Sequence, residues 1–265
     1  METNKIYNKD CLMAMKKMPS NIIDNVITSP PYNTMRHAID QGYDEYKDGI
    51  TNENYSKWVC EIFNEFDRIL KNNGSVIWNM SYGGENTECM SLTVADIIRN
   101  TPFTLADIIV WKKQNATPNN VSQNKITRIC EYVYIFCRKS EFYTFETNKK
   151  VISTSQSNQK IYENIFNYIE APNNDYSTPL NKATFSTDFV KKLIKIYVKP
   201  HSLVLDTFMG TGTTAIGCID SNVNFIGFET SKKQCEHAEK RIADRIRQCS
   251  MFDEIDYNTH KKLGE

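Results

Sequence analysis

Short runs of apolar, β-branched residues recur along the chain and alternate with longer segments whose apolar residues have helical spacing. The short runs predict strands at residues 25–28, 75–78, 107–111, 131–136, 202–206 and 224–228. Helical patterns are found at residues 11–17, 189–198 and 215–219. Strands that alternate with helices are typical of an α/β protein with a mostly parallel central sheet, which is the fold class we expect.

The clearest helical pattern has one strongly apolar, aromatic face. This face consists of Tyr55, Trp58, Val59, Ile62, Phe63, Phe66, Ile69 and Leu70. We interpret it as core packing, and a surface for stacking on bases is the alternative. Asn72, Asn73 and Gly74 follow, and we expect them to cap the C-terminus of the helix.

A further helix is predicted to begin at Ser231, because Gln234 completes a capping-box pattern three residues later. Its apolar face continues through Cys235, Ala238, Ile242 and Ile246. After about Phe252 the chain is polar and the periodicity is lost. Residues 1–252 are therefore expected to form one domain, and residues 253–265 a loose C-terminal tail.

Two stretches interrupt the alternation of strands and helices. Residues 33–54 are polar and follow a Pro-Pro turn, and residues 146–182 are rich in Asn, Ser, Thr and Lys. They are either surface loops or functional segments, since long stretches without regular structure in a compact domain are often functional. The pattern alone leaves both alternatives open.

Composition adds little to this picture. Of the 265 residues, 40% are hydrophobic and 24% are charged, and 32 basic side chains balance 32 acidic ones. A net charge of zero neither supports nor excludes a nucleic-acid partner, because local phosphate contacts set the affinity. No apolar run approaches the ~20 residues of a membrane span and the N-terminus lacks a signal-peptide pattern, so we expect a cytoplasmic protein.

The eight cysteines contain no CxxC pair, and the four histidines are scattered. Cysteines of cytoplasmic proteins are usually reduced, and metal sites usually show closely spaced ligands. We therefore interpret the cysteines as reduced and mostly structural. No histidine is assigned to catalysis, and no metal site is expected.

A glycine loop lies between a strand and a helix. The strand predicted at residues 202–206 runs into Gly210-Thr-Gly212, and a helical pattern follows. Glycine in this position lets the backbone approach a ligand closely. Glu229 ends the next predicted strand 17 positions after Gly212, where an acid can bind ribose hydroxyls.

Two residues indicate which class of ligand this loop binds. A dinucleotide fingerprint would have a third glycine where this chain has Ala215. Asp206 would repel a pyrophosphate, whereas it suits the ammonium group of an amino acid. The loop therefore favours a nucleoside that carries an amino acid over NAD, and a purely structural turn is the alternative.

The strand at residues 25–28 ends abruptly at Ser29-Pro30-Pro31-Tyr32. Prolines cannot donate backbone hydrogen bonds, so the chain forms a stiff turn at the edge where open α/β sheets bind ligands. This turn suits the exocyclic amino group of a base. The Ser29 hydroxyl and a carbonyl, that of Pro30, would accept its two hydrogens, and Tyr32 would stack on the base. A structural turn is again the alternative.

Together, Thr28-Ser-Pro-Pro-Tyr32 and Asp206-Thr-Phe-Met-Gly-Thr-Gly-Thr-Thr214 resemble the catalytic and cofactor motifs of the N4-cytosine/N6-adenine DNA amino-methyltransferases. The catalytic motif comes first, which is the circularly permuted, beta-class order of this family. The resemblance covers most of the chain outside residues 33–54 and 146–182. It implies a Rossmann-like fold that uses S-adenosylmethionine.

The resemblance also implies the site residues. The catalytic residues would be Ser29, Pro30, Pro31 and Tyr32. The S-adenosylmethionine contacts would be Asp10, Asp206, Phe208, Gly210, Gly212, Thr213 and Glu229. Asp10 has an alternative role as the N-cap of the helix at residues 11–17.

Two further segments are similar to parts of the family. Residues 183–188 resemble the segment before the helix that closes over the methionine end, although the usual proline after Phe185 is missing. Residues 127–132 resemble the segment that lines the target-base pocket, and the ordinary start of a strand is the alternative.

The first residue of the catalytic motif bears on the target base. Serine is usual in the cytosine-N4 enzymes and Asp or Asn in the adenine-N6 enzymes, so we expect methylation of cytosine N4, with adenine N6 as the alternative. Methylation at cytosine C5 needs a cysteine nucleophile, and the sequence has no Pro-Cys pair. A non-catalytic nucleic-acid-binding subunit and an NAD-dependent dehydrogenase are weaker alternatives, because both motifs are intact and the third glycine is missing.

The implied substrate is double-stranded DNA, from which the target base must be flipped. Residues 33–54 and 146–182 are expected to hold the flanking DNA. Phosphate contacts are expected from Lys112, Lys113, Lys125, Arg128, Arg138, Lys139, Lys149, Lys150 and Lys160. A homodimer and a restriction endonuclease that acts on the same site are further partners that the resemblance allows.

Overall fold

The computed structural model describes residues 1–33, 49–82, 86–116, 118–120, 123–175 and 184–262, with side chains as far as Cys249. Most of the predicted segment 33–54 and the end of 146–182 lie outside the described residues. No helix in the described part of the chain is long and apolar enough to span a membrane. None of the eight cysteines, all of which lie in the described part of the chain, forms a disulfide bond, and six of them are buried.

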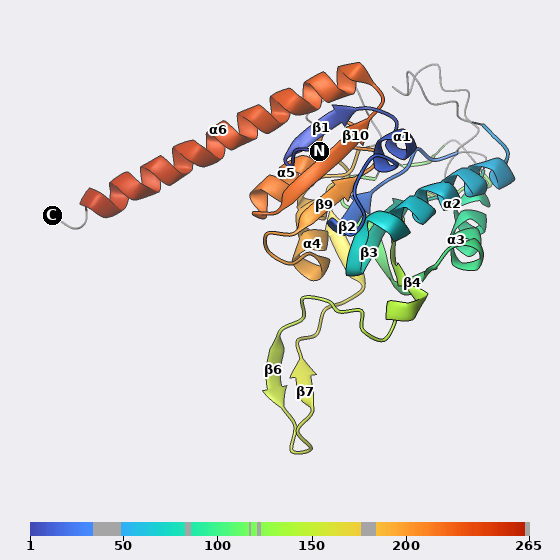
Figure 1. Ribbon diagram of the computed structural model, residues 1–265, viewed down its shortest axis with the longest axis horizontal. Coiled ribbons are helices and arrows are strands. Elements are labelled where there is room, and N and C mark those ends of the chain that lie inside the picture. Colours follow the sequence, from blue (N-terminus) through green and yellow to red (C-terminus); the bar gives the residue numbers. More distant parts are fainter. Residues whose placement is uncertain (34–48, 83–85, 117, 121–122, 176–183, 263–265) are drawn as a thin grey trace.

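An eight-stranded sheet forms the centre of the protein, with the order β1-β10-β9-β2-β3-β5-β4-β8 (Figure 1). Its strands are β1 (Lys5–Asn8), β2 (Ile23–Thr28), β3 (Leu70–Met80), β4 (Phe103–Lys113), β5 (Cys130–Arg138), β8 (Tyr168–Ala171), β9 (Leu203–Asp206) and β10 (Asn224–Glu229). All of them run in one direction except β5, which is antiparallel to β3 and β4. The mostly parallel sheet and every strand predicted from the sequence are confirmed, whereas β1 and β8 were not predicted.

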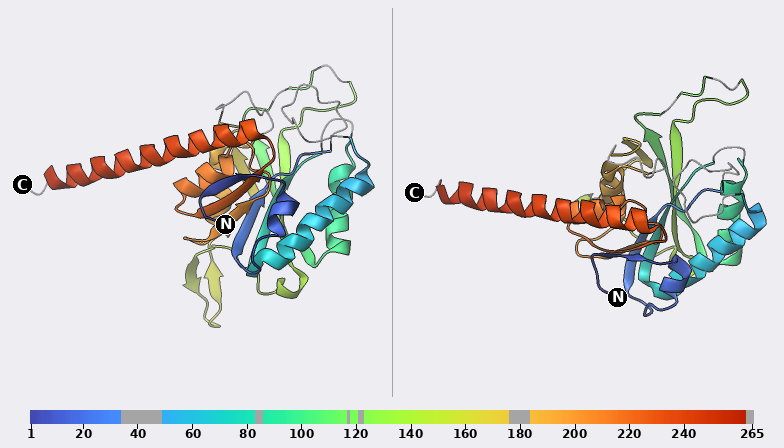
Figure 2. Two further views of the ribbon diagram at one scale, coloured as in Figure 1. Left: turned by 45° about the horizontal axis from the view of Figure 1, so that its top comes forward. Right: turned by 90° about the horizontal axis from the view of Figure 1, so that it is seen from above.

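Helices cover both faces of this sheet (Figure 2). They are α1 (Cys11–Met15), α2 (Asn52–Ile69), α3 (Cys89–Asn100), α4 (Thr187–Tyr197), α5 (Thr213–Asp220) and α6 (Lys232–Lys262), with a 3₁₀ turn, η1 (Lys139–Glu141). One buried cluster lies beneath α1, α2 and α3, and a second lies beneath α4, α5 and the start of α6. The fold is therefore the Rossmann-like arrangement that the sequence predicts.

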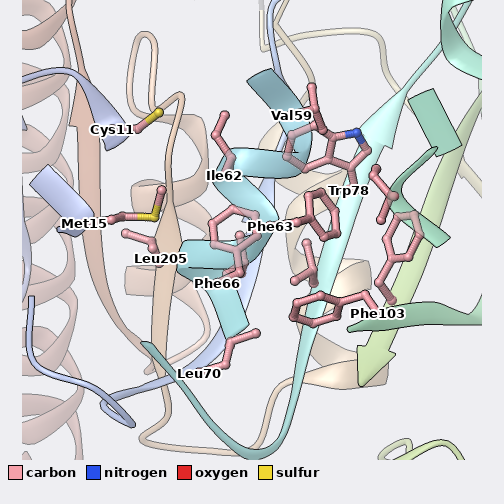
Figure 3. Packing of buried hydrophobic residues seen from close by; sticks show 14 of the residues in the cluster. Cys11, Met15, Val59, Ile62, Phe63, Phe66, Leu70, Trp78, Phe103 and Leu205 are labelled. Carbon is pink, nitrogen blue, oxygen red and sulfur yellow. The ribbon is translucent and has the colours of Figure 1, made fainter. Parts of the chain in front are cut away.

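The aromatic face of α2 packs in the first cluster (Figure 3). The ring of Phe63 meets those of Trp78 and Phe103 nearly edge-on, at centroid distances of 5.2 and 5.4 Å. Such geometry is favourable because a ring edge is positive and a ring face negative. The interpretation of this face as core is confirmed except at Trp58, which stays partly exposed.

Helix α2 ends earlier than the sequence predicts. Its last residue is Ile69, and Leu70 begins β3 by pairing with Ile23 of β2. The expected cap at Asn72, Asn73 and Gly74 is wrong, because these residues lie within β3. A Cβ atom at Gly74 would lie 3.0 Å from the carbonyl oxygen of Asp24, so glycine is needed where two backbones approach closely.

Helix α6 continues to Lys262, so residues 253–262 of the segment that the sequence predicts as a loose tail are helical. The helix extends away from the domain, as both views show (Figure 2). The loss of apolar periodicity after about Phe252 therefore does not mark the end of the helix. No glycine or proline occurs between Lys232 and Lys262, so nothing in the sequence breaks the helix there.

The segment 146–182 contains regular structure that the sequence analysis did not predict. Strands β6 (Val151–Thr154) and β7 (Lys160–Tyr162) form a hairpin, and β8 then joins the main sheet beside β4. The amide nitrogen of Asn148 donates to the carbonyl of Ile196 (2.7 Å) near the end of α4. Because α4 leads into the start of β9, this hairpin lies at the amino edge of the sheet, where the parallel strands begin (Figure 1).

Candidate functional site

A cavity of about 460 Å³ lies at the carboxyl edge of the sheet, where the parallel strands end. Its walls come from the segments that follow β1, β2, β9 and β10. The strand order reverses between β9 and β2, and such a switch point is where open α/β sheets bind ligands. Among the site residues predicted from the sequence, the cavity is lined by Asp10, Ser29, Pro30, Pro31, Tyr32, Phe208, Gly210, Thr213 and Glu229.

Asp206 and Gly212 do not line the cavity. They support the loop that lines it. Gly212 has a φ of 87°, and a Cβ atom there would lie 2.9 Å from the Cβ of Ala238. A side chain would therefore be strained and would also push helix α6 away. The predicted glycine is required, and the structure gives it a packing role against α6.

Asp206 joins the two sequence motifs. Its side chain accepts hydrogen bonds from the Thr28 hydroxyl (2.6 Å), the Thr214 hydroxyl (2.5 Å) and the amide nitrogen of Phe208 (2.9 Å). Thr28 directly precedes the Ser-Pro-Pro-Tyr turn, so this carboxylate fixes the turn relative to the glycine loop. The side chain is 1% exposed, and burial raises the pKa of Asp206 to about 6.

Glu229 ties the glycine loop to β10. Its two carboxylate oxygens accept from the amide nitrogens of Gly210 and Ser231, each at 2.8 Å. The same side chain lines the cavity. Each carboxylate oxygen has lone pairs for a second hydrogen bond, so Glu229 can hold the loop and a ligand hydroxyl together.

The position of Asp10 is compatible with both roles that the sequence left open. Its Oδ1 accepts from the amide nitrogen of Met13 (2.9 Å), which confirms the N-cap of α1. Asp10 also lines the cavity, which is where a cofactor contact would need it to be. The predicted cap of α6 is confirmed as well, because the Ser231 hydroxyl accepts from the Gln234 amide nitrogen (3.5 Å).

An aromatic wall closes the cavity on the side of α2. Trp58 packs on Phe208 of the glycine loop, with ring centroids 5.6 Å apart, and Phe185 also lines the cavity. The helical periodicity predicts a core position for Trp58, because periodicity identifies a helix face but does not show which residue lies at its rim. Phe185 belongs to the predicted segment 183–188, of which Ala183 lies outside the described residues.

The Ser-Pro-Pro-Tyr turn is held from two sides. Tyr55 of α2 donates its hydroxyl to the Pro31 carbonyl (2.9 Å). On the other side the Ser29 and Tyr32 hydroxyls lie 3.3 Å apart, and the Tyr32 hydroxyl donates to Glu131 (3.2 Å). The segment 127–132 thus lies beside the turn, as its resemblance to a base-pocket segment implies.

Two further polar residues beside the turn were missed. Asn79 Nδ2 donates to the Tyr32 hydroxyl (2.9 Å) and to Glu131 Oε2 (3.1 Å), and Lys113 forms an ion pair with Glu131. No sequence pattern indicates Asn79, which lies inside an apolar strand. Lys113 was expected to contact phosphate.

Helix α6 reaches back to the glycine loop through Arg241. Its guanidinium donates to the Thr211 carbonyl (2.7 Å) and to Asp175 Oδ2 (3.1 Å). Asp175 Oδ1 in turn accepts from the Thr187 amide nitrogen at the start of α4 (2.8 Å). One arginine thus connects the cofactor loop to the chain that returns from β8, and no sequence pattern indicates it.

The basic residues expected to contact phosphate divide between the two edges of the sheet. Lys112, Lys113, Lys125 and Arg128 lie at the carboxyl edge, at or between the ends of β4 and β5. Lys139, Lys149, Lys150 and Lys160 belong to the amino edge, on the far side from Ser29. Arg138 is a structural residue, because its guanidinium binds Asp67 and the carbonyl of Leu70.

The chemistry of the cavity fits a nucleoside that carries an amino acid. Aromatic rings offer an apolar wall for a base, while Glu229 and Asp10 offer carboxylates for ribose hydroxyls and a positive charge. Gly210 has a φ of 54°, which exposes the loop backbone to the cavity. Among the described residues, no group of three or more His, Cys, Asp or Glu side chains is placed to hold a metal ion.

Comparisons with known proteins agree with this chemistry. The model of a DNA methylase family, N6_N4_Mtase, matches residues 23–240. The type II methyltransferase M.BglII of Bacillus subtilis is 24% identical over 255 residues, covering 89% of this chain and 68% of the relative. The type II methyltransferase M.SmaI of Serratia marcescens is 25% identical over 273 residues, covering 91% of each chain.

Solved structures share the fold. The PvuII DNA methyltransferase, described as cytosine-N4-specific, has a TM-score of 0.68 and 18% identity, and covers 92% of this chain and 91% of its own. M1.HpyAVI in complex with S-adenosylmethionine has a TM-score of 0.58 and 23% identity. The match covers 89% of this chain and 98% of the M1.HpyAVI chain. Because the family model spans most of the chain and both motifs meet at one cavity, the chain belongs to the N6/N4 DNA methylase family, as a beta-class amino-methyltransferase that uses S-adenosylmethionine.

Proposed function

We propose that the chain methylates the exocyclic N4 of cytosine in duplex DNA, within a specific short sequence, after flipping the base. The observation that carries this proposal is the position of Ser29. Its hydroxyl lies where the cofactor cavity meets the polar side chains of Tyr32, Asn79 and Glu131. A neutral hydroxyl suits the amino group of cytosine, as the resemblance to the N4 enzymes implies.

The chemical problem is that an exocyclic amino group is a poor nucleophile, because its lone pair is delocalised into the ring. S-adenosylmethionine supplies, when bound, a methyl group on a positively charged sulfur. The Ser29 hydroxyl and the Pro30 carbonyl accept the two hydrogens of the amino group and favour tetrahedral geometry at nitrogen. We assign this acceptor to Pro30 because the Pro31 carbonyl already accepts from Tyr55.

Positioning then supplies most of the rate enhancement. The bond from Thr28 to Asp206 fixes the turn and the glycine loop in one frame, so the amino group and the methyl donor would meet in a defined geometry. Tyr32 would stack on the flipped base, and such stacking contributes about 1–3 kcal/mol. Trp58 and Phe208 help to exclude water from the cavity.

The carboxyl edge is the surface that we assign to DNA. The segment between β4 and β5 begins and ends beside Glu131, and Arg128 in it donates to the Tyr82 carbonyl (2.9 Å) and stacks on the Tyr82 ring. Lys125 and Arg128 are our candidates for phosphate contacts. The hairpin β6–β7 points the other way, so within 146–182 only the part after β8 remains a candidate.

Mass spectrometry of nucleosides from DNA incubated with the protein and S-adenosylmethionine tests the proposal. N4-methylcytosine is the expected product, and sequencing would then locate the site. N6-methyladenine would keep the family and the mechanism but show that Ser29 does not select cytosine. Neither product on DNAs of varied sequence, with the cofactor still bound, would overturn the proposed reaction and favour a non-catalytic DNA-binding subunit.

Two partners and a location complete the proposal. The relatives named type II methyltransferases support a restriction endonuclease that acts on the same DNA site. Methylated DNA should then resist cleavage by an endonuclease of that specificity. The family resemblance supports a homodimer, which sedimentation would detect, and a DNA substrate supports a cytoplasmic location.

A further inference from the structure

Three strands on the side of the turn away from the glycine loop carry polar side chains that meet at one point. Asn79 lies near the end of β3, Lys113 ends β4, and Glu131 lies at the start of β5. Because β5 is antiparallel to the other two strands, all three residues lie at the carboxyl edge. We call these residues the Lys113–Glu131–Asn79 network.

The network binds the hydroxyl groups of the catalytic turn. Asn79 Nδ2 lies 2.9 Å from the Tyr32 hydroxyl and 3.5 Å from Ser29 Oγ. The Tyr32 hydroxyl lies 3.2 Å from Glu131 Oε2 and 3.3 Å from Ser29 Oγ. Such contacts are often long before a substrate is bound and shorten in the complex.

The chemistry of these groups gives the hydrogen bonds one direction. An ionised carboxylate only accepts hydrogen bonds, and the Nδ2 group of an amide only donates them. The Tyr32 hydroxyl accepts from Asn79, so its own proton points to Glu131. The Ser29 hydroxyl then points its proton to Tyr32, which turns its lone pairs toward the place of the target amino group.

Burial supports a functional role for this arrangement. Asn79 is 4% exposed, and its Oδ1 atom is buried without a hydrogen-bond partner among the described residues. A buried unpaired acceptor is unfavourable, and an apolar residue would avoid it within this apolar strand. The side chains of Glu131 and Lys113 are only 14% and 22% exposed, so solvent screens their attraction less than it would at an open surface.

We propose that the Lys113–Glu131–Asn79 network positions the Ser29 hydroxyl as an acceptor for the target amino group, acting through the hydroxyl of Tyr32. Lys113 holds Glu131 in place, Glu131 accepts the hydrogen bond that the Tyr32 hydroxyl donates, and Asn79 prevents the reverse orientation. This inference rests on the proposed amino-group methylation. It assigns positioning roles to residues that do not line the cofactor cavity.

Glu131→Gln is the first test, because glutamine keeps the size but can both donate and accept. At saturating DNA and S-adenosylmethionine, the single-turnover rate should fall about tenfold or more, which is the effect of one functional hydrogen bond. The dissociation constant for S-adenosylmethionine should stay within about twofold, since the network is separate from the cavity. Lys113→Met should also lower the single-turnover rate, and it replaces Glu131→Gln as the test if that variant does not fold.

A matched control comes from the ion pair of Lys112, the neighbour of Lys113 on β4. Lys112 forms an exposed ion pair with Glu170 (3.3 Å), with side chains 39% and 43% exposed. Glu170→Gln removes a carboxylate of the same kind that also pairs with a lysine of β4, but from β8 and without touching the turn. It should leave both the rate and the melting temperature unchanged.

A double-mutant cycle separates positioning through Tyr32 from general structural damage. Tyr32→Phe should slow methylation, and adding Glu131→Gln to it should slow it no further than about twofold. Multiplied losses in the double variant would overturn the inference, as would equal rates for Glu131→Gln and Glu170→Gln in an active protein. A wild-type protein that makes no methylated base would overturn the proposed function itself, and the inference with it.

Discussion

The two halves of the site are built in different ways. On the side of β9 and β10 the glycine loop is held by the carboxylates of Asp206 and Glu229, which accept backbone and threonine hydrogen bonds within a short stretch of chain. On the side of β3, β4 and β5, side chains from four separate segments meet at the Ser-Pro-Pro-Tyr turn. The cofactor half is therefore encoded locally, and the base half is assembled by the fold.

This difference has a functional meaning. A cofactor of constant structure can be bound by a fixed backbone loop. The amino group of a target base, in contrast, must be oriented by side chains. Asp206 and Thr28 join the two halves through one hydrogen bond of 2.6 Å. Changes on either side of that bond should therefore separate cofactor binding from methyl transfer.

The largest separation is expected from Ser29→Ala. Loss of the hydroxyl removes one acceptor for the target amino group, and we expect a fall of about a hundredfold in the single-turnover methylation rate. Calorimetry should give an unchanged dissociation constant for S-adenosylmethionine, because the glycine loop is intact. A matching loss of cofactor affinity would show that the two halves are not separable.

A comparable change in the other half is Gly212→Ala. The left-handed φ of 87° and the contact with Ala238 both oppose a side chain. The free energy of unfolding should fall by about 2–4 kcal/mol, from backbone strain and overpacking together. Thermal unfolding and calorimetry should both detect the change, as a lower melting temperature and weaker S-adenosylmethionine binding. An unchanged melting temperature would contradict the packing role of this glycine.

Local encoding also explains what the sequence could predict. Six strands of the main sheet, the glycine loop and the Ser-Pro-Pro-Tyr turn each depend on a few adjacent residues, and these were predicted. The meeting of Asn79 with Glu131 depends on an antiparallel β5 inserted between β3 and β4, and no local pattern specifies that order. Trp58 was misassigned for a similar reason, since the cavity beside it is formed by distant segments.

Short exposed elements form the other group that was not predicted. The strands of the β6–β7 hairpin have exposed side chains on both faces, so they lack the alternating pattern that identifies a half-buried strand. Helix α6 beyond residue 252 has a polar sequence without an apolar face, so periodicity does not indicate a helix there. Hydrophobic pattern predicts elements with an apolar face, and neither the hairpin strands nor the end of α6 has one in its sequence.

Acid should weaken the cofactor half selectively. The pKa of Asp206 is raised by burial to about 6 from its ordinary value of 3.8, so Asp206 takes up a proton as the pH falls through that value. A positive charge bound in the adjoining cavity favours the ionised form. The affinity for S-adenosylmethionine should therefore be full above pH 6 and fall by up to about tenfold per pH unit below it.

Asp206→Asn provides the control for this pH dependence. Asparagine keeps the size of the side chain but does not titrate, so its cofactor affinity should be lower than that of the wild type at pH 7 and flat between pH 7 and 5. In the wild type without cofactor, the free energy of unfolding changes with pH in the opposite direction to the cofactor affinity. The folded state binds the extra proton between about pH 6 and 4, so this group raises the free energy of unfolding as the pH falls.

The smallest effect is expected from Arg241→Met, which tests whether the cofactor half depends on anything beyond its own loop. Methionine keeps apolar contacts along α6 but loses the hydrogen bonds to Thr211 and Asp175. We expect the Michaelis constant for S-adenosylmethionine to rise about threefold to tenfold with kcat unchanged, since each lost hydrogen bond contributes about 1 kcal/mol.

Arg247→Met is the matched control, because Arg247 pairs with Asp244 on the exposed surface of the same helix. It should change neither constant, since exposed ion pairs contribute little. If Arg241→Met lowered kcat as well, the contact between Arg241 and Asp175 would also affect the target-base side of the site. The cofactor half would then extend across the chain that returns from β8, and its encoding would be less local than the glycine loop alone indicates.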